Sequence, residues 1–198
     1  MADFKEAFDK TIGHEGGWNH RASDRGGETY KGIARRYHAE SKVWRYIDLA
    51  KQSENFPKNI NHRRLEKYVE DFYRTEFWNP IKGFLIPDQD IANMVFDVAV
   101  NGGVTRASKY FQQILNVLNR RGLDYPDLKV DGILGPKSIT TLKLYLYRRD
   151  RLVFLVFYGA KMVNHWLDFA KDNEDQEESI NGIGNRWVTI LKDIAGKL

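Results

Sequence analysis

A glutamate beside a glycine pair is the first residue in this sequence that could take part in catalysis. Glu15 is in helical phase with Phe4 and Phe8, so it is expected on the apolar face of a helix that Gly16-Gly17 ends. Burial and the negative end of the helix dipole both raise the pKa of such a carboxyl. A carboxylic acid that stays protonated near neutral pH can protonate the leaving oxygen of a glycosidic bond.

A polar, glycine-rich segment follows, and it carries two further candidates. Asp24 lies nine residues after Glu15 and Thr29 lies fourteen after it, within residues 18–32, which predict turns or a short hairpin. Folded back, this segment would face the proton donor with a carboxylate or a held water, as glycosidic hydrolysis requires. The alternative is an ordinary glutamate at a helix end, paired with an arginine of the same segment.

Helices must position these groups, because apolar residues recur every three or four positions along most of the chain. After the first helix, a second is expected through Leu65, Val69, Phe72 and Phe77, ended by Asn79-Pro80, and a third through Ile91, Met94, Val95, Val98 and Ala99, ended by Asn101-Gly102-Gly103. A fourth is expected over residues 105–119, with Phe111, Ile114, Leu115 and Leu118 inward. Further helices are expected from Pro136, over residues 150–170, and through Trp187, Ile190, Leu191 and Ile194. The acidic stretch 171–178 is expected to be a solvated loop. We predict a mainly α fold.

The chain is expected to contain two parts, a catalytic part over residues 1–108 and a helical part over residues 109–198. The weakest seam lies around residues 103–125. Tryptophans outside the N-terminal motif are expected in the core; they are Trp44, Trp78, Trp166 and Trp187.

Composition narrows the classes of partner and cofactor. Hydrophobic residues make up 42% of the 198 residues, enough for a core, and the absence of cysteine excludes disulfides and thiolate metal sites. The histidines lack a compact metal-ligand spacing, so we expect no metal and no cofactor. The most apolar segment, residues 152–160, is about half the length that crosses a bilayer, so no stable membrane insertion is expected.

The net charge of +4 favours a polyanionic partner, which nucleic acid and bacterial cell wall both are. The basic residues are spread thinly, and no basic run or aromatic-basic platform points to nucleic acid. The first residues carry acids where an export signal needs a basic flank. We therefore expect a protein made without a signal peptide, and a monomer.

The N-terminal motif also resembles a known family. The run HEGGWNHRASDRGGETYKGIA, residues 14–34, resembles the signature of the glycoside hydrolase 108 family of bacterial and phage lysozymes. More loosely, it is similar to the glutamate–aspartate–threonine triad of phage-type lysozymes. Later segments agree in order: residues 96–101 resemble the family's Asp-x-Ala-Val-Asn helix, and residues 130–137 resemble the opening of its C-terminal predicted peptidoglycan-binding region. Asn185-Arg186-Trp187 resembles the end of that region.

This resemblance implies a lysozyme-like helical fold and an enzyme that cleaves the β-1,4 bond after N-acetylmuramic acid in peptidoglycan. Such an enzyme would act on the bacterial cell wall after release or export. By position, Glu15 would be the catalytic acid, Asp24 would stabilise the oxocarbenium-like transition state, and Thr29 would position a water. The candidate substrate contacts are Trp18, Tyr30 and Asn101. A core role for Trp18 has equal weight, and Tyr30-Lys31 stands where many members have an asparagine and an aromatic residue.

Three other functions stay open. The first is a chitinase-like or lytic transglycosylase activity on the same scaffold. A lytic transglycosylase needs no water-holding carboxylate, so a dispensable Asp24 would favour it. A non-catalytic wall-binding or secretion-accessory protein would be expected to have lost at least one of Glu15, Asp24 and Thr29. The third is a nucleic-acid-binding helical protein, which only the basic charge suggests.

Overall fold

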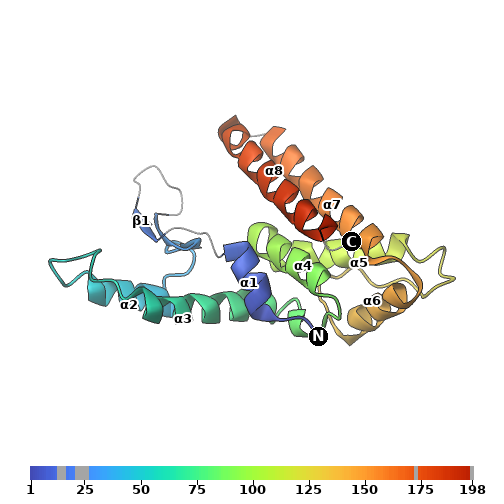
Figure 1. The fold of residues 1–198 in the computed structure, drawn as a ribbon, viewed down its shortest axis with the longest axis horizontal. Helices are drawn as coiled ribbons and strands as arrows, with labels where there is room; N and C mark the ends of the chain where they lie inside the picture. Colours follow the sequence, from blue (N-terminus) through green and yellow to red (C-terminus); the bar gives the residue numbers. More distant parts are fainter. Residues whose placement is uncertain (13–16, 21–26, 172–173, 197–198) are drawn as a thin grey trace.

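The computed structural model describes residues 1–12, 17–20, 27–171 and 174–196. Over these residues α-helices predominate, and a small three-stranded antiparallel sheet lies toward one end of an elongated molecule (Figure 1). The predicted mainly α class, with a hairpin in the N-terminal motif, is confirmed. Within the same residues, no helix is long and apolar enough to cross a membrane.

The helices are joined by connections of very different length. Their bounds are α1 Phe4–Ile12, α2 Lys42–Ala50, α3 His62–Tyr73, α4 Gln89–Gly102, α5 Val104–Val117, α6 Pro136–Arg148, α7 Arg151–Lys171 and α8 Glu174–Ala195, with a π-helical turn η1 Arg74–Trp78 and a short 3-10 turn η2 Gly83–Leu85. The strands are β1 Trp18–His20, β2 Glu28–Tyr30 and β3 Ile33–Ala34.

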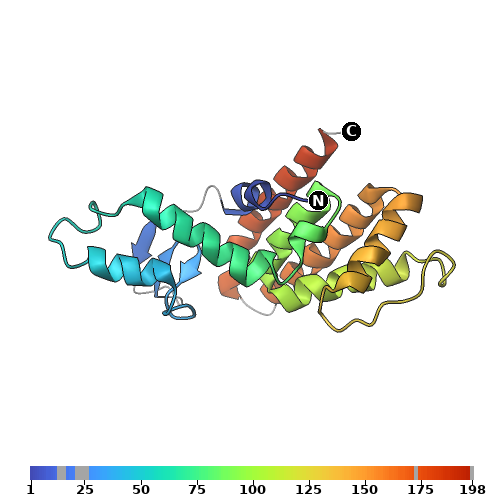
Figure 2. The ribbon, with the colours of Figure 1, turned by 90° about the horizontal axis from the view of Figure 1, so that it is seen from below.

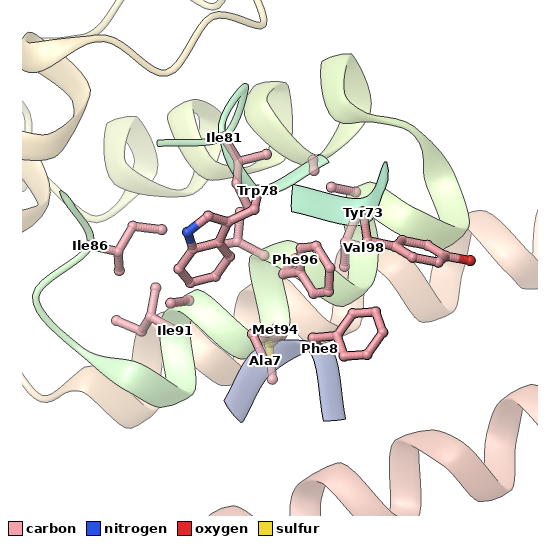
Figure 3. Close-up of a cluster of buried hydrophobic side chains, with 14 of the residues drawn as sticks. Ala7, Phe8, Tyr73, Trp78, Ile81, Ile86, Ile91, Met94, Phe96 and Val98 are labelled. Carbon is pink, nitrogen blue, oxygen red and sulfur yellow. The ribbon is translucent and has the colours of Figure 1, made fainter. Parts of the chain in front are cut away.

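Helix α4 forms the centre of the core. Every residue from Asp90 to Ala99 is buried, because α1, α5 and α7 all pack against this helix. Phe96 lies 5.9 Å from Phe4 and 5.8 Å from Trp78 between ring centroids, edge-to-face in both cases, and Figure 3 shows Phe96 and Trp78 in this cluster. The predicted α4 pattern is therefore confirmed, although the helix is buried on all sides rather than on one.

Helices α1 and α4 run parallel. The backbone N–H of Asp3 donates to Gln89 at 2.6 Å, and one turn further along both helices the Asn93 amide donates to Glu6 at 3.1 Å. Since both contacts advance in the same direction, the two helices end at the same end of the bundle (Figure 1). The chain thus leaves α1 beside the C-terminal end of α4.

The sheet has the order β1-β2-β3, with β2 in the centre. Thr29 lies opposite Asn19 on β1 and Ala34 on β3. A two-residue turn joins β2 to β3, and both of its residues are left-handed, Lys31 at φ 45° and Gly32 at φ 76°. This is the turn geometry that matches the twist of a tight hairpin. The third strand was not predicted from the sequence.

The helix predicted through Leu65 and Val69 contains a change of register. Leu65, Val69 and Tyr73 are buried at intervals of four, and the next buried residue is Trp78, after the π-helical turn η1. A π turn accommodates one extra residue. Phe72 and Phe77, also expected in this helix, are half-buried and pack against the core.

The C-terminal half forms a pair of long helices, α7 and α8, beside α5 and α6 (Figures 1 and 2). The acidic stretch predicted as a solvated loop is wrong from Glu174 onward, because α8 begins there. Acidic residues favour the first turn of a helix through its dipole, and neither glycine nor proline interrupts them. Trp44, Trp78 and Trp187 are buried as predicted, whereas Trp166 is half-buried.

Candidate active site

Glu15 and Asp24 lie outside the described residues. Glu15 belongs to the segment that joins α1 to β1, and Asp24 to the segment that joins β1 to β2. The structure therefore defines the supports on either side of these segments. The apolar face on which Glu15 was predicted is buried as far as Ile12, including Phe4, Phe8 and Thr11.

Thr29 is the central residue of the sheet, and its surroundings differ on the two faces. Alternate residues of a strand point to opposite faces, so Thr29 shares one face with Asn19 and Ala34, while Glu28 and Tyr30 point to the other. Tyr30 is packed toward α3, so the Thr29 face is turned away from that helix. Thr29 is half-buried and Asn19 is exposed, and Ala34 beside them is small.

Asn19 was not among the residues predicted from the sequence. It lies directly across from Thr29, and an amide there can donate to and accept from a sugar or a water that Thr29 also holds. The signal that could have identified it is the two-residue period of the strand, once the pairing register is known.

Trp18 is half-buried and held on its polar and apolar sides. Its ring packs edge-to-face on Phe56 at 4.9 Å between centroids, and its Nε1–H donates to Glu28 at 2.9 Å. The ammonium of Lys51 lies 5.9 Å from the ring. Of the two roles weighed for Trp18, these contacts favour packing, and a sugar contact through its exposed edge stays a prediction.

Tyr30 is fully buried, which argues against the predicted contact with substrate. Its hydroxyl lies 3.1 Å from Nδ1 of His62, and its ring is roughly parallel to the imidazole. Burial, followed by the charge of Glu66, raises the pKa of Tyr30 to about 12. Tyr30 therefore anchors β2 to α3, and a sugar could reach its ring only if the core opened.

Glu28 on β2 is a half-buried acid that the sequence analysis missed. Its side chain, 10% exposed, accepts hydrogen bonds from Trp18, from Arg35 at 2.9 Å and from Lys51. Arg35 also forms a two-pronged pair with Asp48 on α2, at 2.6 Å for each bond. Burial raises the pKa of Glu28, but the bonds from Lys51, Trp18 and Arg35 outweigh it and the net pKa is lowered.

This network makes Glu28 a charged support and not a proton donor. A carboxylate that accepts three hydrogen bonds stays ionised and ties the central strand to α2. A carboxyl that acts as a proton donor would need the opposite environment, one that disfavours its ionised form. The residue beside Glu28 in the strand is Thr29, so the network fixes the backbone from which Thr29 projects.

Asn101 is exposed on the last turn of α4, where its amide donates to the carbonyl of Asp97 at 2.8 Å. Because α1 and α4 run parallel, Asn101 is at the end of the bundle at which the chain leaves Ile12 toward Glu15. The position fits the predicted contact with substrate, which stays a prediction. Within the described part of the chain, no group of His, Asp and Glu residues has the arrangement of a metal site.

Comparison with known proteins divides the chain into two matched regions. Residues 8–103 match the family described as Glycosyl hydrolase 108, and residues 106–188 match the Predicted Peptidoglycan domain. The matches meet at the start of α5, ahead of the boundary predicted after residue 108, which stays a prediction. No curated protein matches the chain.

Among solved structures, the chain is similar to SagA of Brucella abortus. The two are 18% identical, the TM-score is 0.58, and the match covers 94% of each chain. Identity at this level shows a shared fold. The two family matches go further, because they follow one another over most of the sequence and the first contains Glu15, Asp24 and Thr29. Residues 8–103 therefore belong to the glycosyl hydrolase 108 family, which makes the protein a glycoside hydrolase, and residues 106–188 form a predicted peptidoglycan domain that makes peptidoglycan its binding partner.

Proposed function

We propose that this peptidoglycan hydrolase cleaves the β-1,4 bond between N-acetylmuramic acid and N-acetylglucosamine, with Glu15 as the general acid. The family match across residues 8–103 carries the proposal, because it contains the Glu-Gly-Gly-aromatic motif at Glu15. The buried face of α1 supports it, since a carboxyl that continues this face would keep its proton near neutral pH. The proton would pass from Glu15 to the leaving oxygen.

Asp24 and Thr29 are proposed to act on the opposite side of the bond. Asp24, ionised in a polar segment, would stabilise the positive charge that develops on the sugar ring. Thr29 would hold the attacking water, helped by Asn19 across the strand. The open sheet face that these two residues share, next to the small Ala34, supports a water there. Direct attack by water would invert the configuration at the anomeric carbon.

The test of the general acid is the loss of turbidity of purified peptidoglycan with Glu15→Gln. Glutamine keeps the shape of the side chain but has no proton of suitable acidity, so the rate should fall by a factor of about 10²–10⁴. Asp9→Asn is the matched control, because Asp9 is an exposed acid on α1 that pairs with Lys5. A folded Glu15→Gln protein that lyses peptidoglycan at the wild-type rate would contradict the proposal.

The products decide between hydrolysis and the alternatives. Hydrolysis leaves a reducing sugar, whereas a lytic transglycosylase leaves a 1,6-anhydro end. We expect reducing ends, with inverted configuration in the first product observed by NMR. Anhydro ends would replace hydrolysis by transglycosylation, retention would refute the role given to Thr29, and wild-type protein without any product would indicate a wall-binding module.

A further inference from the structure

A groove lined by basic and aromatic side chains lies beside the sheet, on the side that the proposed chemistry does not use. It runs between α2 and α3, which lie side by side in Figure 2, and its volume is about 430 Å³. Its walls carry Lys42, Arg45, Tyr46, Leu49, Arg64 and Tyr68. The groove is open to solvent, so a ligand can enter it from outside the chain.

The α2 wall is the outward face of an amphipathic helix. Val43, Trp44 and Ile47 are fully buried on the inward face. Lys42, Arg45 and Leu49 are exposed on the outward face, and Leu49 keeps 65% of its surface in water. An exposed leucine between cations provides an apolar contact beside positive charge, a combination that neither the core nor the sheet requires.

The α3 wall holds its cation in a fixed position. The Arg64 guanidinium lies 5.6 Å from the centroid of the Tyr46 ring, and its Nε donates to the Tyr68 hydroxyl at 3.4 Å. The Tyr46 hydroxyl accepts the backbone N–H of Asn61 at 3.1 Å, and the two tyrosine rings are edge-to-face at 6.4 Å. A cation held over a ring keeps its other N–H groups free for an acceptor.

The groove has an excess of positive charge. Arg45 pairs with Glu40 at 3.3 Å, but both side chains are strongly exposed and such a pair is weak. Within the described part of the chain, Lys42 and Arg64 form no ion pair. The acids nearest in sequence are already bound elsewhere, because Asp48 pairs with Arg35 and Glu66 pairs with Lys31.

We propose that this groove binds a carboxylate-bearing peptide stem of peptidoglycan. Arg64 and Lys42 would bind its carboxylates, while Leu49 and the tyrosine rings would contact the methyl groups of its alanines. The assignment rests on the proposed function, which makes peptidoglycan the substrate. The groove opens on the outward faces of α2 and α3, whereas Thr29 lies on the sheet face turned away from α3. The bound stem therefore belongs to a different part of the peptidoglycan from the sugars that react.

The test is an NMR titration of the full chain with a soluble stem tetrapeptide, compared with the same peptide amidated at its carboxylates. We expect shifts confined to α2 and α3 with the acidic peptide, and roughly tenfold weaker binding for Arg64→Gln, which loses a charged hydrogen bond. Arg63→Gln is the control, since Arg63 is an exposed arginine on the same helix that does not line the groove. Lys42→Gln is a second variant that leaves the ring packing intact.

Several results would overturn the assignment. Equal binding of the amidated peptide, shifts away from α2 and α3, or no loss of binding in either groove variant would each do so. Tighter binding of a glycerol phosphate oligomer than of the peptide would assign the groove to a phosphate polymer instead. The titration requires no turnover, so its failure would leave the Glu15→Gln result standing, and failure of that experiment would leave the binding result interpretable.

Discussion

Replacing Gly32 with alanine should destabilise the turn that joins the central strand β2 to β3. Gly32 has φ 76°, and a left-handed alanine costs about 1–2 kcal/mol. A Cβ atom there would lie 2.7 Å from the Tyr73 hydroxyl, which donates to the Lys31 carbonyl at 2.8 Å. Displacing that bond adds about 0.5–1.5 kcal/mol. Together these effects predict a loss of about 2–3 kcal/mol in the free energy of unfolding.

Thermal unfolding followed by circular dichroism measures this loss. For a chain of this size each kcal/mol lowers the Tm by about 2–4 °C, so we expect Gly32→Ala to melt about 4–12 °C lower. Gly135→Ala is the control, because that residue has φ −104° and open space around its Cβ position. In a Tyr73→Phe background the hydroxyl is absent, so Gly32→Ala should cost only the backbone part. An equal cost in both backgrounds would refute the contact with Tyr73 as a cause.

Two further changes test the rest of the architecture. Glu28→Gln should lower the Tm at neutral pH. Folding lowers the pKa of Glu28 from its ordinary 4.5, so the carboxylate stabilises the fold above that pH and loses this effect as the pH falls through the lowered pKa. The Tm values of the two proteins should therefore converge in acid. A gap in Tm that persists at pH 2 would contradict this reasoning. Truncation after residue 108 should abolish cooperative unfolding and peptidoglycan binding, because it removes Phe111, Phe154 and Tyr158, each worth about 1.5–3 kcal/mol of burial. A fragment that melts like the whole chain and sediments with peptidoglycan as strongly as the whole chain would show that the C-terminal part contributes neither stability nor binding.

Periodicity predicted the helices whose burial is simple. Ile91, Met94, Val95 and Val98 are all in the core of α4, and Pro136 opens α6 as its fixed φ favours. The hairpin could be predicted because a cluster of glycine and polar residues between two periodic segments marks turns. Glu15, Asp24 and Thr29 were predicted as site residues from spacing and family resemblance. The structure adds the sheet and the contacts that hold the backbone of Thr29.

The features that were missed depend on contacts distant in sequence. The π turn before Trp78 shifts the inward face by one residue, which a fixed helical period does not anticipate. Glu28 looks like a solvated strand residue until Arg35 and Lys51 are folded around it. Tyr30 was expected at the substrate because of its neighbours in the motif, but its place in the strand alternation directs it to His62 and the core.

The position of α4 has a consequence for how the two regions of such proteins can evolve. This helix belongs to the region matched to the hydrolase family, yet α5 and α7 from the peptidoglycan region cover its sides, and Arg151 of α7 binds Asp90 at 2.6 Å. A recognition region taken from a relative would have to bring a helix surface that fits this one and an arginine at the matching point. Recombination within α5 should therefore yield insoluble chimeras more often than working ones. Changes in wall preference are then expected to arise by substitution within an existing pair of regions rather than by exchange of one of them.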